Sequence, residues 1–167
     1  MLALNIKDIK DFMNKLLVGN IFDSFWLTEA AITTFNTFHI DGTLHQDFFD
    51  SDSLETLSAQ NRSHSLWRDV KPYCYSMIKE KRTPLNFKII FQLPAAQTEQ
   101  TAARAMTGAA SGQIKGMYLN LQYKNDSLLC TTGVSFSAFF PDKRPEQAWD
   151  NMILGFFQKH QIIFEKL

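Results

Sequence analysis

Two imidazoles and two carboxylates stand close together in one segment, His39-Ile40-Asp41-Gly42-Thr43-Leu44-His45-Gln46-Asp47. These residue types bind transition metals when their side chains converge. However, Asp41-Gly42 is a dipeptide preferred by two-residue type I′ hairpin turns, in which both turn residues need positive φ. We therefore predict a strand over 31–40, a turn, and a strand over 43–49. In that register His39 and His45 point to opposite sides of the ribbon, so no metal site is expected.

Other motifs for catalysis or cofactor binding are missing from the sequence. It contains no Cys pair with zinc spacing, no His-Glu-x-x-His, and no calcium-binding EF-hand loop. It also lacks a Gly-x-Ser-x-Gly elbow, a phosphate-binding P-loop and a dinucleotide-binding Gly-x-Gly-x-x-Gly turn. His64 and His160 are isolated and are expected at the surface. The sequence therefore predicts no catalytic residues, no metal and no cofactor, and favours a protein that is not an enzyme without deciding the question.

A basic segment follows the second long helix that the sequence predicts. Lys81, Arg82 and Thr83, with Lys88 on the next strand, could hold a carboxylate or phosphate through charge-assisted hydrogen bonds. Cations at the end of a helix also interact favourably with its dipole, which explains the pattern without any ligand. Both interpretations remain open at this stage.

Hydrophobic periodicity predicts an α+β fold. Alternation marks one clear strand over 85–93 and a hairpin of strands 117–123 and 128–139, joined at Asn125-Asp126. Helices are expected from an Asn5 cap to Leu17, near 53–60, over 66–80, near 96–106, and from Pro145 onward. This order lacks regular βαβ alternation and favours an antiparallel, or else mixed, sheet of about five strands with helices mostly on one face. A bend or bulge is expected near Glu29-Ala30-Ala31. We predict one domain over 1–167, in which 94–116 form a mobile surface excursion.

Composition narrows the classes of partner. Lys plus Arg and Asp plus Glu both number 17, so no global field attracts nucleic acid or an anionic membrane. We see neither a signal peptide nor a long apolar run, and we expect a cytoplasmic protein. Cys74 and Cys130 are predicted to be reduced core residues. The 15 Phe residues should mostly fill the core, with a surplus that could form an exposed patch and support a homodimer.

Polar residues along several predicted strands point to an uncovered sheet face. Asn86, Lys88, Gln92, Asn120 and Gln122 alternate with apolar neighbours. Such a face is either simply hydrated or a binding platform. A third interpretation, stacking of single-stranded nucleic acid on Tyr118 or Tyr123, would require those rings to be exposed beside Lys88, Lys115 and Lys124.

Three segments carry a resemblance to known sequences: 33–42, 81–93 and 130–133, which read Thr-Thr-Phe-Asn-Thr-Phe-His-Ile-Asp-Gly, Lys-Arg-Thr-Pro-Leu-Asn-Phe-Lys-Ile-Ile-Phe-Gln-Leu and Cys-Thr-Thr-Gly. Through them the chain resembles a family of uncharacterised proteins of anaerobic, clostridial-type bacteria. The resemblance implies a bacterial, cytoplasmic setting and no mechanism.

Two functional hypotheses follow. The first is a non-enzymatic binding or self-associating protein that uses the open sheet face or a Phe-rich patch. The alternative is a small enzyme or ligand-binding domain that holds an anionic group near Lys81 and Arg82.

Overall fold

The structure is a computed structural model that describes residues 1–78, 82–106 and 112–167. These residues include a seven-stranded sheet in the order β3-β2-β4-β5-β6-β1-β7, and every neighbouring pair is antiparallel. The strands are β1 (Ala3–Ile6), β2 (Trp26–Thr33), β3 (Thr37–Asp41), β4 (Asn86–Gln92), β5 (Ile114–Lys124), β6 (Ser127–Phe136) and β7 (Phe164–Lys166).

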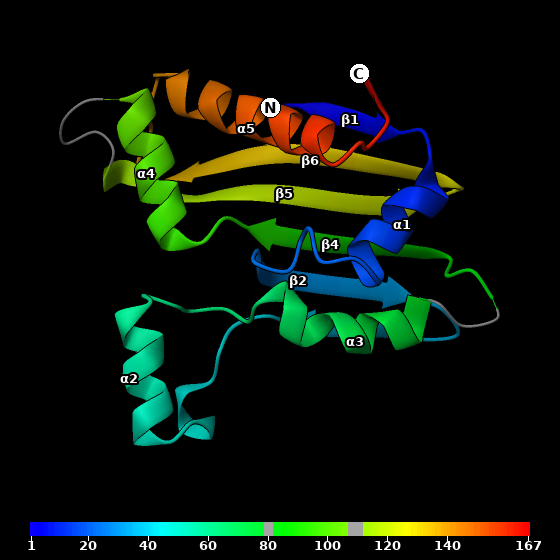
Figure 1. Ribbon diagram of the computed structural model, residues 1–167, viewed down its shortest axis with the longest axis horizontal. Helices are drawn as coiled ribbons and strands as arrows, with labels where there is room; N and C mark the ends of the chain where they lie inside the picture. Colours follow the sequence, from blue (N-terminus) through cyan, green and yellow to red (C-terminus); the bar gives the residue numbers. More distant parts are fainter. Residues whose placement is uncertain (79–81, 107–111) are drawn as a thin grey trace.

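Four of the α-helices lie over one face of this sheet (Figure 1). They are α1 (Ile9–Leu17), α3 (Trp67–Ile78), α4 (Ala95–Ala105) and α5 (Arg144–Lys159), and a short 3-10 helix, η1 (Gln46–Phe48), precedes α2 (Ser51–Ala59). In Figure 1, α2 stands apart from the sheet, beyond β2. The α+β class and the antiparallel sheet are therefore confirmed. The expected five strands and the expected packing of the helices on one face are only approximately right, since the sheet has seven strands and α2 stands apart from it.

The core lies between the sheet and the helices. Alternate residues of β4, Phe87, Ile89 and Phe91, are almost completely buried, as the alternation predicts. Trp67 from α3, whose ring centroid lies 5.1 Å from that of Phe91, and Trp149 from α5 are buried in the same core. Each indole N–H donates to a backbone carbonyl, that of Trp67 to Leu16 at 3.0 Å and that of Trp149 to Tyr118 at 2.8 Å. These bonds satisfy the single polar atom of each buried ring.

The beginning of the chain differs from the prediction. Asn5 and Ile6 belong to β1, between β6 and β7, and α1 begins later, where the Asp8 carboxylate accepts from the Asp11 N–H at 3.0 Å. The spacing of Ile6, Ile9 and Phe12 is typical of one continuous helix. In the structure, however, Ile6 is a buried residue of β1 and pairs with Phe164 of β7. The two terminal strands, β1 and β7, account for the extra strands.

The predicted hairpin at Asp41-Gly42 is wrong. The reversal between β2 and β3 lies at 34–36, where the Thr34 N–H donates to the Asn36 carbonyl at 2.8 Å, and Asp41 is the last residue of β3. A turn with two positive φ angles occurs instead at Asn125 (51°) and Asp126 (57°), between β5 and β6. The expected irregularity near Glu29 is present as a register shift between Leu27 and Glu29.

Other predicted elements hold with changed limits. The helix near 96–106 is present as α4, and residues 114–116 of the predicted excursion extend β5. Residues 107–111 lie outside the described part of the chain, so the predicted mobility of 94–116 stays a prediction. Pro72 lies inside α3. The helix was predicted to extend to residue 80, but residues 79 and 80 lie outside the described part of the chain. No helix in the described ranges has the length and apolar character needed to span a bilayer.

Candidate functional site

The chain leaves the sheet after β3 and returns just before α3. We call residues 44–62, which contain η1 and α2, the α2 excursion. Two backbone bonds close its base: the Leu44 N–H donates to the Ser63 carbonyl at 2.9 Å and the Ser65 N–H to the Gly42 carbonyl at 2.8 Å. The returning segment then continues the sheet beside β2, since the Leu27 N–H donates to the Ser65 carbonyl at 2.8 Å. These bonds hold the base of the excursion against the sheet.

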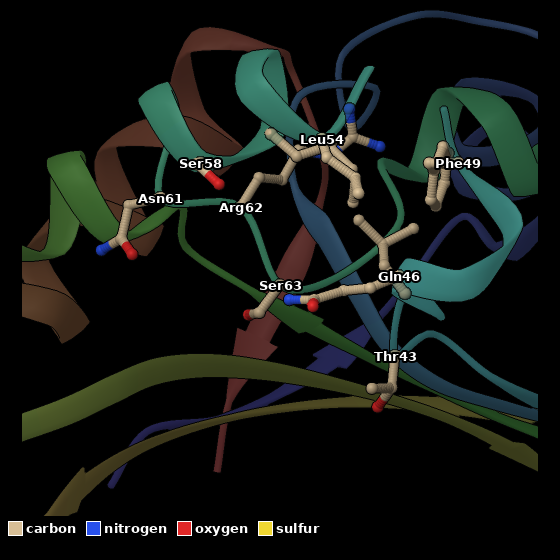
Figure 2. A pocket seen from close by; sticks show the side chains of 10 residues that line it. Thr43, Gln46, Phe49, Leu54, Ser58, Asn61, Arg62 and Ser63 are labelled. Carbon is tan, nitrogen blue, oxygen red and sulfur yellow. The ribbon is translucent and has the colours of Figure 1, made fainter. Parts of the chain in front are cut away.

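A cavity of about 320 Å³ lies inside this excursion. Figure 2 shows side chains from α2, from the segment before it and from the segment after it around a shared hollow. The lining residues are Thr43, Leu44, Gln46, Phe49, Leu54, Leu57, Ser58, Asn61, Arg62 and Ser63.

The sequence of α2 explains why one of its faces lines the cavity. Asp50 caps the helix by accepting from the Ser53 N–H at 2.7 Å, which lowers the pKa of the Asp50 carboxyl. Leu54, Leu57 and Ser58 then recur at helical spacing and face the hollow. No residue of α2 is fully buried. The two leucines therefore line space that no other side chain fills.

The cavity has an apolar part and a polar part. Leu44, Phe49, Leu54 and Leu57 are all half-buried, which leaves apolar surface facing the hollow. The other lining residues carry hydroxyl, amide or guanidinium groups. Arg62 is the one charged residue among them. This division suits a molecule with an apolar body and a polar end.

Arg62 is held by two neighbours. Its Nε donates to the His64 carbonyl at 3.1 Å, and its Nη2 lies 3.6 Å from Asp69 Oδ2 at the start of α3. Its side chain is only 16% exposed, whereas that of Asp69 is 57% exposed. The guanidinium is therefore enclosed by the protein, while its acidic partner faces solvent.

His64 stands beside the cavity and is not the isolated surface residue that the sequence predicts. Its ring is half-buried and stacks on Trp26 with centroids 6.1 Å apart, and its Nδ1 lies 2.7 Å from Ser63 Oγ. Burial lowers the pKa of His64, and the charge of Asp41 partly opposes this. The Nδ1 of a neutral imidazole can accept a hydrogen bond from the Ser63 hydroxyl. However, the Asp41 carboxylate accepts from the Thr43 N–H at 2.9 Å, and no bond from Asp41 to the imidazole occurs in the structure as described. The three residues thus lack the relay of a hydrolytic triad.

The segment 39–47, which contains His39 and His45, does not form the hairpin that the sequence predicts. His39 is paired with Ala31 in the β2–β3 ladder, and its Nε2 lies 3.3 Å from Glu29 Oε1, while His45 lies past the base of the excursion. The register used to separate the two histidines was wrong, since the turn lies elsewhere. Within the described ranges, no group of three His, Cys, Asp or Glu side chains is arranged to hold a metal ion.

Three of the four residues of the predicted anion site lie in the described part of the chain. Arg82 and Thr83 are exposed in the loop before β4, and Lys88 is exposed on the sheet. None of these three lines the cavity of the α2 excursion. Lys81 lies outside the described residues. The site therefore stays a prediction.

The aromatic residues mostly serve the core. Tyr123 is only 7% exposed and stacks on Phe87 with centroids 5.4 Å apart, so it offers no ring for a nucleic-acid base. Tyr118 is half-buried. The strongly exposed phenylalanines are in three different connections: Phe35 between β2 and β3, Phe48 in η1 and Phe139 after β6. The Phe surplus therefore does not gather on one segment.

The fold and this cavity define a class: an antiparallel α+β domain with a hollow helical excursion at one edge of its sheet. The chain belongs to a family of unknown function, DUF5721, whose profile matches residues 15–165. No curated protein and no solved structure matches it. No function is therefore transferred from a relative.

The cavity was not predicted from the sequence, although part of its signal was present. The helix near 53–60 was predicted, and the spacing of Leu54 and Leu57 on it is the signal that could have marked the lining face. Whether these leucines face a cavity depends on the backbone bonds at the base of the excursion, between Leu44 and Ser63 and between Ser65 and Gly42. The spacing of residues in the sequence does not reveal these bonds.

Proposed function

We propose that this protein binds a small molecule in the cavity of the α2 excursion, without enzymatic activity. The observation that carries the proposal is a hollow of about 320 Å³ whose apolar lining is left unfilled. This volume falls at the small end of the range of about 300–1,000 Å³ for ligand pockets.

Physical chemistry favours an occupant with an apolar body. Removing apolar surface from water stabilises a complex by roughly 25 cal/mol per Å², before the costs of association are subtracted. The leucines of α2 and Phe49 present such surface in a concave arrangement (Figure 2). A ligand that contacts both α2 and the opposite wall would also hold the excursion closed.

A pair of matched variants tests this proposal. Leu57→Trp places an indole in the cavity, whereas Glu55→Trp places the same ring on the exposed side of α2. We expect the neutral dye Nile red to fluoresce more strongly with the unmodified protein and with Glu55→Trp than with Leu57→Trp. Circular dichroism on all three proteins checks that α2 is retained. Equal dye binding by the two variants would place the dye elsewhere and contradict the proposal.

Self-association is a second candidate function. The uncovered face of the sheet carries half-buried Ile90 on β4 and Leu129 on β6, and this mixed surface supports contact with a second copy. Light scattering over a range of concentrations tests it: a constant monomer mass would reject it.

The anion site near Lys81 and Arg82, the anaerobic bacterial origin and the cytoplasmic location also remain proposals.

A further inference from the structure

Resting on the proposed function, we infer that the ligand is an amphipathic monocarboxylate whose carboxylate binds Arg62 in place of Asp69. The inference depends on three features of the excursion: an enclosed guanidinium, a weak existing partner, and a lining without any acidic side chain.

The guanidinium of Arg62 is prepared to receive an anion. Its Nε–H is already bonded to the His64 carbonyl, which fixes the plane of the group at the cavity wall. The Nη atoms remain for an ionic partner. A planar guanidinium binds a carboxylate through parallel hydrogen bonds, and such charge-assisted bonds are about twice as strong as neutral ones.

Asp69 is a weak competitor for this position. The 3.6 Å separation between Arg62 Nη2 and Asp69 Oδ2 is longer than a hydrogen bond. Asp69 also lies 4.0 Å from Arg68 Nε and is largely exposed, so water screens both interactions. A carboxylate that enters from the cavity would meet Arg62 on its enclosed side, where screening is smaller.

The remaining lining residues are compatible with a single negative charge. None is acidic, so no like charge opposes the anion, and Ser58, Asn61 and Ser63 supply neutral hydrogen-bonding groups. The apolar chain of the ligand would then lie against Leu54, Leu57 and Phe49.

Three probes with the same chain separate the headgroup from the apolar body: octanoate, octanol and octylamine. Isothermal titration calorimetry should show octanoate binding about tenfold more tightly than octanol, because of the charge-assisted bonds. Octylamine should bind more weakly than octanol, since its ammonium would face Arg62. Equal affinity for octanoate and octanol would overturn the inference and leave the proposed function standing. If none of the three bound, the proposed function would fail as well.

Variants on the two partners complete the test. Arg62→Gln should remove the preference for octanoate while octanol still binds. Asp69→Asn should tighten octanoate several-fold and leave octanol unchanged, because it frees the guanidinium. Arg68→Gln is the matched control, since it removes a neighbouring charge outside the cavity lining and should preserve the preference. Unchanged octanoate affinity in Asp69→Asn, or equal losses in the Arg62 and Arg68 variants, would contradict direct binding by Arg62.

Discussion

Gly42 lies directly against the backbone of Leu27. A Cβ added to Gly42 would come within 1.7 Å of the Leu27 carbonyl oxygen, a distance that no relaxation of a side chain can relieve. The close approach is stabilised by the Gly42 N–H, which donates to the Thr28 carbonyl at 3.0 Å. The base of the α2 excursion therefore depends on the absence of a side chain at this position.

Gly42→Ala should consequently destabilise the protein. We expect a loss of about 2–4 kcal/mol in the free energy of unfolding, because β2 and the base of the excursion must separate. Gly155→Ala is the control: nothing lies within 4 Å of its Cβ position in α5, and alanine should stabilise that helix by up to about 1 kcal/mol. Urea unfolding of the two variants measures both effects, and equal stability would contradict the tight contact.

Thr132 forms a buried link between β6 and α5. Its hydroxyl accepts from the Leu2 N–H at 2.8 Å and donates to Asp150 Oδ1 at 2.5 Å, and the residue is 2% exposed. Thr132→Val keeps the shape but leaves the Leu2 N–H without its acceptor, so we expect a loss of about 1–3 kcal/mol. Thr131→Val, on the half-exposed neighbour, should cost less than about 1 kcal/mol in the same unfolding experiment. Similar losses in both variants would show that the hydroxyl of Thr132 has no special role.

Stability should fall on acidification, in part because of His64. Burial lowers the pKa of His64 in the folded state, so the unfolded chain binds a proton more readily near its ordinary value of about 6.5. The free energy of unfolding should therefore decrease between about pH 7.5 and about pH 5.5. Burial, followed by Lys159 and Lys15, also lowers the pKa of His160, which acts in the same direction.

His64→Gln should make this pH dependence shallower without abolishing it. His45→Gln, at an exposed position of the α2 excursion, is the matched control and should retain the slope. Thermal unfolding across the pH range measures the slopes directly. A steeper dependence after removal of His64 would reverse the sign of its contribution and refute the argument.

Both cysteine thiols should be unreactive in the folded protein. Burial raises the pKa of Cys74 to about 12 and also raises that of Cys130, and both residues are free and buried. Since the thiolate is the reactive form, Ellman's reagent should label neither cysteine at mildly alkaline pH until denaturant is added. Rapid labelling of the native protein would indicate opening of α3 or β6.

Several elements could be predicted because their signal is local. The alternation of Phe87, Ile89 and Phe91 identifies β4, and Asn125-Asp126 between alternating runs identifies the β5–β6 hairpin. For β1 the deciding interaction is remote: Leu4 pairs with Cys130 in β6 and with Lys166 in β7. Four residues give too short a pattern to distinguish such a strand from the start of a helix.

The candidate site likewise combines features with a local signal in the sequence and features that depend on remote contacts. The sequence by itself determined the α+β class, the buried cysteines, and a helix near 53–60, which carries Leu54 and Leu57. Only the tertiary structure decided that these leucines face a cavity, that Arg62 is enclosed beside it, and that Gly42 permits contact with Leu27 instead of forming a turn. The physical reason is that periodicity reports which face of an element avoids water, whereas the partner of that face depends on residues far away in the chain.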